Sequence, residues 1–365
     1  MKSILYITNI PAPYRIEFFN RLAEKSNVTV VYERLSMGDR DLNWLNSVEI
    51  KHNQVVMSEN EGYSHFKTGL KIAKYILSNY KKYDEIILGC CNSKAQMLAY
   101  LILCFLRKDF AVNLDGETFF DDKGLKLFAK RFFVKGAKRF YIAGIKSAKN
   151  AKKVIQKAKA KYIPYYFSSL TKNEIAENEK KSTEANREDY VLVVGRFFDY
   201  KGLDIALQVA KEMPETNFKF VGMAERTESF EKLVLSEKVT NAEVVSFMTK
   251  EELEQEYLKC RVLLLPSRKE CWGLVVNEAA SYGTPIVSTY GSGAAVEFFS
   301  EKYPELLAEP ENVSSLKKAL ESFLEKDEKY LSDYKNYVLE IGKKYTIEKN
   351  VEVHLKALEN RERNS

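Results

Sequence analysis

The sequence predicts an α/β protein built from two doubly wound, Rossmann-like domains that face one another. Its 365 residues give room for about two domains of ordinary size. Short β-branched runs alternate with longer amphipathic stretches, and this alternation is typical of parallel sheets wrapped by helices. A polar stretch rich in Lys, Glu, Asn, Ser and Thr interrupts the pattern near the middle, after which the alternation restarts.

The first half holds runs that favour strands, separated by helical patterns. Strands are expected at Ile4–Thr8, Val28–Tyr32, Glu85–Leu88, Phe110–Leu114 and Arg139–Ile142. Helices are expected near Tyr14–Lys25, Phe66–Tyr80, Ser93–Arg107, Gly124–Lys135 and Ile145–Lys157. We assign these elements to an N-terminal domain over residues 1–167, and we interpret the polar residues 168–188 as a linker.

The second half repeats the plan. Strands are expected at Tyr190–Val194, Phe218–Val221, Glu243–Val245, Val262–Leu265 and Pro285–Ser288. Helices are expected at Leu203–Met213, Ser229–Lys238, Glu251–Lys259 and Leu274–Tyr282, the third opened by a capping box of Thr249 and Glu252. A C-terminal domain over residues 189–340 accommodates them, and a C-terminal helix over 341–365 can return to the N-terminal domain.

Composition narrows the classes of protein. Hydrophobic residues make up 45% of the chain and charged residues 30%, as in ordinary globular proteins, and the net charge of +6 selects no partner by itself. The five cysteines have no paired spacing, which favours reduced thiols over a disulfide framework or a zinc site. The longest apolar run, Met97 to Leu106, is about half of a membrane span. We therefore expect a cytoplasmic protein, for which contact with the inner face of a membrane is one option.

The first chemical motif runs from Val193 to Gly202. A strand ends in Gly195, and the following loop presents Arg196 and Lys201 five residues apart before a helix begins. Ligands of open α/β sheets bind at the carboxyl ends of strands, and an Arg fork with a Lys point charge suits a pyrophosphate. The alternative is a glycine turn with two solvated cations.

The second motif places two carboxylates, Glu270 and Glu278, eight residues apart around a Trp272-Gly273 step. Glycine permits close approach of a ligand, and a helix opening at Leu274 would point free N–H groups at a phosphate. Glu278 could accept from ribose hydroxyls and Glu270 from hexose hydroxyls, with the pyrophosphate between them. The alternative is a strand–turn–helix corner with Glu278 on a solvated face.

Together these segments resemble family 4 of the glycosyltransferases, whose members have the GT-B fold of two Rossmann-like domains facing a central cleft. Gly-Arg-x-x-x-x-Lys-Gly and Glu-x7-Glu both match, in the right order and about seventy residues apart. The segments 282–288 and 291–294 also resemble the family's next strand and glycine loop. The match is tight over residues 190–300 and weaker elsewhere.

The resemblance implies a retaining transfer from a nucleotide-diphosphate sugar, with no cofactor and no obligatory metal. Residue by residue, it places the diphosphate on Arg196 and Lys201 and the ribose on Glu278. It places the sugar and phosphate on Glu270, a candidate catalytic residue, and on the backbone of Trp272, Gly273 and Leu274. The base is expected near Gly222 and the strand end that carries Phe247 and Met248.

The N-terminal half departs from the family pattern. Prolines replace the usual glycine pair after the first strand, and Arg15 in the first helical turn is expected to approach the cleft, the alternative being a surface cation. Many family members have a histidine after the strand at 110–114, where this chain has Asp115 and Glu117. Asp115 is our second catalytic candidate, and Glu117 a candidate acceptor or cleft residue. An ordinary Asp-Gly turn is the alternative.

A basic segment fills residues 123–161, with twelve lysines, two arginines and no Asp or Glu. Phe128, Phe132, Phe133, Val134, Phe140 and Tyr141 are interleaved with these cations. Such a surface suits an anionic membrane face, and solvated helix faces around core aromatics are the alternative. No nucleic acid is expected, because no recognised module accompanies the charge. Asp39-Arg40-Asp41 is interpreted as a surface loop and not as a metal site.

The leading hypothesis is a hexosyltransferase that builds cell-surface polysaccharide, such as a capsule, or a lipid-linked oligosaccharide. Its partners would be a nucleotide-sugar donor and a glycan or lipid-diphosphate-linked acceptor. Two alternatives stay open: a nucleotide-sugar epimerase of the same fold, and a basic membrane- or RNA-binding protein with a vestigial site.

Overall fold

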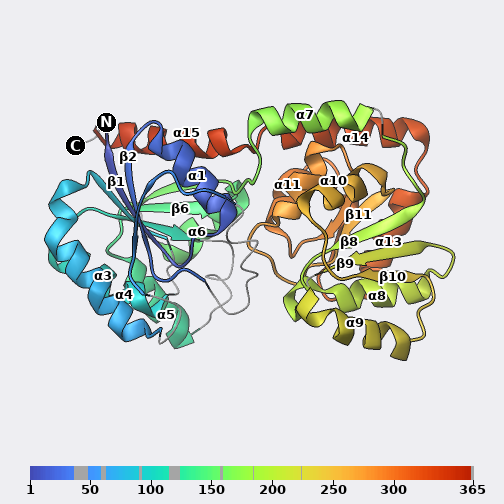
Figure 1. Ribbon diagram of the computed structural model, residues 1–365, viewed down its shortest axis with the longest axis horizontal. Coiled ribbons are helices and arrows are strands. Elements are labelled where there is room, and N and C mark those ends of the chain that lie inside the picture. The colour runs from blue at the N-terminus through green and yellow to red at the C-terminus, as the bar shows by residue number, and fades with distance from the viewer. Residues whose placement is uncertain are drawn as a thin grey trace. The chain divides into compact units, whose positions relative to one another are not determined.

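The computed structural model describes residues 1–36, 48–58, 63–89, 93–114, 124–156, 159–183, 185–222 and 224–362. The chain divides into two compact units, the first formed by Met1–Ser169 with Ile347–Ser365 and the second by Leu170–Thr346. Each unit contains a parallel sheet with helices packed against it (Figure 1). The prediction of two Rossmann-like α/β domains is therefore confirmed.

The first unit has a seven-stranded sheet in the order β3-β2-β1-β4-β5-β6-β7, and every described strand pair is parallel. Its strands are β1 (Ser3–Thr8), β2 (Asn27–Tyr32), β3 (Asn53–Val56), β4 (Glu85–Leu88), β5 (Ala111–Leu114), β6 (Arg139–Ala143) and β7 (Lys161–Tyr165). Its helices are α1 (Pro13–Ala23), α3 (His65–Asn79), α4 (Lys94–Phe105), α5 (Gly124–Val134), α6 (Ile145–Ile155) and α15 (Ile347–Glu362).

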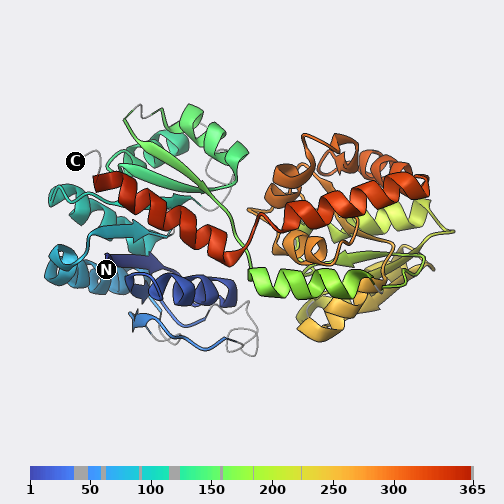
Figure 2. The same ribbon diagram turned by 90° about the horizontal axis from the view of Figure 1, so that it is seen from above.

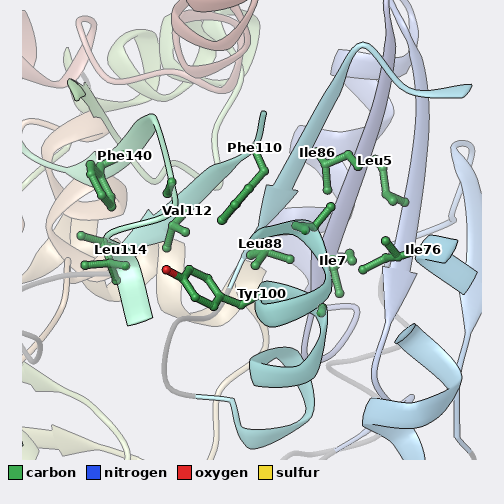
Figure 3. Packing of buried hydrophobic residues seen from close by; sticks show 14 of the residues in the cluster. Leu5, Ile7, Ile76, Ile86, Leu88, Tyr100, Phe110, Val112, Leu114 and Phe140 are labelled. Carbon is green, nitrogen blue, oxygen red and sulfur yellow. The ribbon is translucent and has the colours of Figure 1, made fainter. Parts of the chain in front are cut away.

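One large apolar cluster joins this sheet to α3, α4, α5 and α6 (Figure 3). The strands contribute residues such as Ile7, Leu88 and Phe140, and the helices contribute residues such as Ile76 and Tyr100. Because one contiguous cluster contains residues from all four helices, these helices cover the same face of the sheet. Their outward surfaces therefore lie on one side of the unit.

The second unit has a six-stranded parallel sheet in the order β10-β9-β8-β11-β12-β13. Its strands are β8 (Tyr190–Val194), β9 (Asn217–Val221), β10 (Ala242–Val245), β11 (Val262–Leu265), β12 (Ile286–Thr289) and β13 (Leu307–Ala308). Its helices are α7 (Lys172–Thr183), α8 (Leu203–Glu212), α9 (Ala224–Ser236), α10 (Lys250–Lys259), α11 (Leu274–Ser281), α12 (Gly293–Phe299), α13 (Val313–Leu324) and α14 (Glu328–Gly342). The capping box of Thr249 and Glu252 opens α10 as predicted.

The assignment of residues 168–188 to a linker is wrong, because α7 forms there and packs within the second unit. Thr171 and Glu174 exchange hydrogen bonds in a capping box: the Glu174 carboxylate accepts from the Thr171 backbone N–H at 2.8 Å, and the Thr171 hydroxyl accepts from the Glu174 N–H at 3.2 Å. Asn178 then donates to the Ser281 hydroxyl at 2.8 Å. The capping box starts the polar helix, and the Asn178–Ser281 bond joins it to α11.

The C-terminal segment also differs from the single helix expected over 341–365. Residues 341 and 342 complete α14, and α15 begins only at Ile347. The chain ends in the first unit, where α15 lies beside α1 and β7 (Figure 2). His354 of α15 stacks on Tyr141 with ring centroids 4.5 Å apart, and Phe18 of α1 lies 4.8 Å from the same imidazole.

A buried ion cluster crosses the first sheet. Arg139 on β6 donates to both carboxylate oxygens of Glu85 on β4 at 3.0 Å and to Asp109 at 3.1 Å. The side chain of Glu85 is fully buried and that of Arg139 is 6% exposed. Burial alone would lower the pKa of Arg139, but the two carboxylates raise it. Arg139 is therefore part of the interior and not of the basic surface predicted over 123–161.

Candidate active site

The candidate site lies at the carboxyl edge of the second sheet. Strands β8, β11 and β12 are neighbours in that sheet and run parallel. The loops that follow them are residues 195–202, 266–273 and 290–292. Because the carboxyl ends of parallel strands share one edge, the two predicted motifs meet there, at the usual ligand position of an open α/β sheet.

Gly202 holds the first two of these loops together. Its φ of +71° lies in the left-handed region, and a Cβ at this position would overlap the carbonyl oxygen of Pro266. The backbone N–H groups of Arg268 and Lys269 donate to the Tyr200 carbonyl at 3.0 and 3.3 Å. The glycine that ends the first motif is thus required by contact with the second.

The third loop closes on the second in the same manner. Glu270 donates its N–H to the Gly291 carbonyl at 2.7 Å, and Gly293 donates to the Glu270 carbonyl at 3.3 Å. Glu270 and Ser292 form a parallel β-bridge. Backbone hydrogen bonds therefore fix the position of the Glu270 main chain from one side, while the first loop approaches from the other.

The side chains of Lys201 and Glu270 meet in an ion pair at this junction. They are 11% and 14% exposed, so both charges are largely withdrawn from water. The second carboxylate oxygen of Glu270 accepts from the Ser267 hydroxyl at 2.9 Å. The structure thus brings together one cation and one carboxylate that the sequence placed 69 residues apart.

Gly273 and α11 complete this corner. Gly273 has a φ of +101°, and a Cβ there would lie 3.5 Å from the Glu270 carboxyl carbon and 3.0 Å from the Ser292 hydroxyl. Helix α11 begins at the next residue, Leu274, so the positive end of its dipole lies beside Glu270. The N-terminus of α11 can therefore bind an anionic group beside the Lys201–Glu270 ion pair.

The side chain of Trp272 belongs to the interior of the second unit. Its indole is 3% exposed, donates to the Asn277 side chain at 2.7 Å, and packs near Phe298 and Tyr345. This burial fixes the start of α11, so a ligand role for Trp272 is confined to main-chain atoms, as expected from the sequence.

Arg196 is oriented by aromatic residues of its own loop. Its guanidinium donates to the Tyr200 hydroxyl at 2.7 Å and lies 4.7 Å from the centre of the Phe198 ring. The same loop carries Lys201, so the two predicted cations stand on one short segment. This contact with Tyr200 was not predicted. The only sequence feature that could have indicated it is that Tyr200 follows Arg196 by four residues.

Glu278 lies in the second turn of α11 and accepts a hydrogen bond from the Tyr257 hydroxyl at 3.1 Å. Burial, reinforced by the Glu278 charge, raises the pKa of Tyr257 well above its usual value. Tyr257 comes from α10 and was not predicted, because nothing in its local pattern indicates a contact with α11. The carboxylate is therefore oriented by a buried phenol before any ligand contact.

The expected base-binding residues lie after β9 and β10 at the same sheet edge. Gly222 faces the Phe197 ring, which a Cβ would overlap, and Phe197 stacks on Phe230 at 4.6 Å. Phe247 is 51% exposed and Met248 half-buried. Phe197 is thus a further aromatic surface at this position that sequence reasoning missed.

Arg268 is a positioning residue that the sequence also left unassigned. Its guanidinium makes two hydrogen bonds to the Asp204 carboxylate, at 2.7 and 2.6 Å, and so ties the second loop to α8. The hydrogen bonds with Asp204 raise the pKa of Arg268. The loop that carries Glu270 is therefore held by α8 as well as by its neighbours.

In the first unit, Arg15 lines a pocket with eight other residues from α1, α15, the sheet and the segment after β7. Arg15 is buried rather than a surface cation, and its guanidinium lies 5.7 Å from the Phe167 ring centre. The lining residues are Tyr6, Tyr14, Arg15, Phe18, Tyr165, Phe167, Ser168, Asn350 and His354. Asp115, Glu117 and the segment Asp39–Asp41 fall outside the described residues.

His354 gives this unit an expected pH dependence. Burial lowers its pKa to about 4, and its Nδ1 donates to the Asn350 carbonyl at 2.9 Å. As pH falls from about 6.5 to 4, the unfolded chain takes up the imidazole proton before the folded chain does. The free energy of unfolding should then fall by up to roughly 3 kcal/mol through this group.

Urea unfolding of the first unit across this pH range tests the expectation. His354→Phe should make the dependence shallower, whereas His65→Gln, at an exposed histidine, should leave it unchanged. The buried His52, whose pKa is also lowered to about 4 by burial, should leave a residual slope. An unaltered slope in His354→Phe would contradict the assignment.

Comparison with known proteins shows which family the second unit resembles. Residues 174–340 match the family described as Glycosyl transferases group 1. The matched residues lie within the second unit, which carries the candidate site. The stretch that matches an uncharacterized glycosyltransferase of Haemophilus influenzae is 32% identical over 190 residues, half of this chain and half of that protein. An uncharacterized 41.2 kDa protein from the cps region of Klebsiella pneumoniae is 34% identical over 139 residues, 37% of each chain.

Solved structures extend the likeness to the whole fold. Sucrose-phosphate synthase from Thermosynechococcus elongatus aligns over 100% of both chains with a TM-score of 0.74 and 16% identity. HepE from Anabaena in complex with UDP and glucose aligns over 99% of this chain and 100% of that one, with a TM-score of 0.73 and 15% identity. The chain thus shares the fold of these GT-B structures, with two Rossmann-like α/β domains. In the described residues, no helix is both long and apolar enough to cross a bilayer.

Proposed function

We propose that the protein is a retaining glycosyltransferase that transfers a hexose from a nucleotide-diphosphate sugar. The observation that carries this proposal is the largely buried Lys201–Glu270 pair beside the start of α11, held by three loops. Lys201 and Arg196 would hold the donor diphosphate, and Glu278 the ribose. Gly222, Phe247 and Met248 would border the base. The site would need no cofactor and no obligatory metal, because protein cations and the helix dipole supply the positive charge.

Breaking the bond between the sugar and the diphosphate leaves extra negative charge on the nucleotide. Lys201, Arg196 and the N–H groups at Leu274 would stabilise that charge. Glu270 would accept from sugar hydroxyls, with Ser267 holding its other oxygen. Asp115 would orient the acceptor hydroxyl or steady the positive charge that develops on the sugar. Asp115 and Glu117 stay proposed partners from the first unit, for catalysis and for the acceptor respectively.

For the acceptor we propose a glycan or a lipid-diphosphate-linked saccharide in cell-surface polysaccharide assembly, at the cytoplasmic face of the membrane. The likeness to a protein from a cps region supports this role. Arg15 of the buried pocket would lie on the acceptor side, in the first unit.

A thermal-shift screen of nucleotide sugars, followed by product analysis, tests the proposal. A donor at about 100 times its Kd should add roughly 2.7 kcal/mol of stability, or a melting shift of about 5–10 °C for a unit of this size. The matching nucleoside alone should give much less. A screen in which no nucleotide sugar stabilises the protein would contradict donor binding. Conversion of the sugar without any acceptor would indicate an epimerase instead.

A further inference from the structure

Three helices of the first unit carry an exposed apolar surface. Eight of the sixteen large apolar side chains that are exposed in the described part of the chain belong to α3, α4 and α5. They are Phe66, Leu70, Leu77, Met97, Leu101, Phe105, Phe128 and Phe132. Phe105 is the most exposed of them at 87%, followed by Phe66 at 73% and Phe128 at 66%. Such concentration on one side of a unit is unusual for a surface that faces only water.

The spacing of these side chains forms a stripe on each helix. Met97, Leu101 and Phe105 recur every four residues along α4, and Phe128 and Phe132 do the same on α5. The opposite face of α4 is buried in the core through residues such as Ala99 and Leu103. Helix α4 is therefore apolar on both faces, and packing against the sheet accounts for only one of them.

The three stripes belong to one surface. Helices α3 and α4 pack side by side, and Tyr100 of α4 donates to the Phe132 carbonyl of α5 at 3.2 Å. All three helices cover the same face of the sheet, as the shared core cluster requires. Figure 1 shows α3, α4 and α5 in succession along one side of the unit. We call this apolar surface, with the lysines around it, the α3–α5 face.

The charge of the α3–α5 face has one sign. Helices α3, α4, α5 and the neighbouring α6 contain no Asp or Glu. Exposed lysines surround the apolar stripes, including Lys67 and Lys74 on α3, Lys94 on α4 and Lys149 on α6. An apolar centre with a cationic surround complements an anionic lipid surface, which accepts both Phe or Leu side chains and ammonium groups.

We propose that the α3–α5 face docks on the surface of an anionic lipid bilayer, with Phe66, Phe105 and Phe128 entering the headgroup region. Docking would bring the protein to the lipid-linked acceptor of the proposed function. The inference rests on the proposed function for this biological role, and the docking itself is argued from the surface alone. A second copy of the chain is a poorer occupant, because two faces without acidic residues would bring like charges together. Nucleic acid is also poorer, because aliphatic side chains share the surface with the aromatic ones.

The proposal relocates the membrane contact expected from residues 123–161. Of the apolar residues interleaved there, Phe128 and Phe132 are exposed, whereas Val134, Phe140 and Tyr141 are buried in the first unit. The docking surface is therefore centred on α3 and α4, with α5 at its border and the lysines of α6 beyond it.

Vesicle flotation with the full chain tests this docking. The probes are vesicles of equal parts phosphatidylglycerol and phosphatidylcholine, and vesicles of phosphatidylcholine alone. The protein should float with the anionic vesicles, bind the neutral ones at least about tenfold more weakly, and lose affinity as salt rises. Phe105→Glu/Phe128→Glu should weaken binding to anionic vesicles by roughly tenfold or more.

Leu235→Glu is the matched control, because Leu235 is 76% exposed on α9 of the second unit. It should bind vesicles as the wild type does, and so should Lys201→Ala, whose altered residue belongs to the donor site. The two experiments are therefore independent. A failure of donor binding would contradict the proposed function without affecting the flotation result, and a failure of flotation would contradict the docking without affecting the donor site.

Three results would overturn the proposal: no flotation with anionic vesicles at low salt, equal binding by the double Phe variant, or retention of RNA in place of vesicles. Size-exclusion chromatography tests whether a second copy of the chain binds this face instead. A wild-type dimer that the double variant abolishes, without vesicle binding, would assign the face to a second copy.

Discussion

Lys201→Ala is expected to lower kcat/KM for sugar transfer by about one to two orders of magnitude. A charge-assisted hydrogen bond contributes about 1.5–3 kcal/mol, and 1.4 kcal/mol is a factor of ten in rate. The substitution removes the ammonium group that pairs with Glu270 at the junction of the three loops. Steady-state kinetics with the donor found in the thermal-shift screen measures the loss.

Lys211→Ala provides the matched control in the same unit. Lys211 pairs with Glu237 at 2.8 Å, and its side chain is 48% exposed on α8. Its removal should leave kcat/KM unchanged. Because Lys201→Ala leaves a largely buried carboxylate without its cation, Glu270→Gln is tested beside it. Full turnover in a folded Lys201→Ala protein would rule out the assigned role.

Arg139→Leu is expected to cost the first unit about 3–5 kcal/mol of unfolding free energy. The variant removes the guanidinium that balances the charge of the fully buried Glu85 carboxylate. Asp109, which is 20% exposed, can still reach water. Urea unfolding at neutral pH measures the change.

The double variant Arg139→Leu/Glu85→Leu distinguishes the loss of charge balance from the loss of packing. It should recover most of the stability, because replacing a whole buried ion pair by apolar groups is often neutral. Lys349→Ala breaks an exposed pair with Glu352 on α15 and should change little. A loss in the double variant as large as in Arg139→Leu would show that the ion cluster is not the cause.

The central strands of both sheets and the edge strand β10 followed from the sequence, whereas the edge strands β3, β7 and β13 did not. Runs such as Val28–Tyr32 and Val262–Leu265 are buried on both faces and so are nearly all apolar. Strand β3 is mostly exposed and reads Asn-Gln-Val-Val, and β7 contains Pro164 in an edge strand. Edge strands need less apolar surface, so the periodicity that predicts central strands is weak in them.

Helix α7 was missed because its polar composition predicted a linker, although a local capping pattern in the sequence indicated a helix. Residues 168–188 are polar because α7 buries only Ile175, Asn178 and Ser182. The capping pair Thr171 and Glu174 was present in the sequence, in the same pattern as the Thr249–Glu252 box that was predicted correctly. The Thr171–Glu174 pair therefore predicts the start of α7 in the same way as the Thr249–Glu252 box predicts the start of α10.

The candidate site was predicted in part, for a physical reason. Gly202, Lys201 and Glu270 belong to motifs that can be found by residue type and spacing alone, although the contacts that they make join loops far apart in the sequence. Tyr257 and Arg268 act across elements, by holding Glu278 and Asp204. Such contacts depend on how α10, α11 and α8 pack, and no local pattern in the sequence encodes that packing.

Hydrogen–deuterium exchange with and without a bound nucleotide sugar tests the central claim most directly. If one diphosphate-bearing molecule contacts all three loops, amides in 195–202, 266–273 and 290–293 should exchange more slowly together when it binds. The α3–α5 face should exchange at its original rate and serves as the internal reference. Slower exchange confined to one loop, or found only outside the carboxyl edge of the second sheet, would contradict the claim.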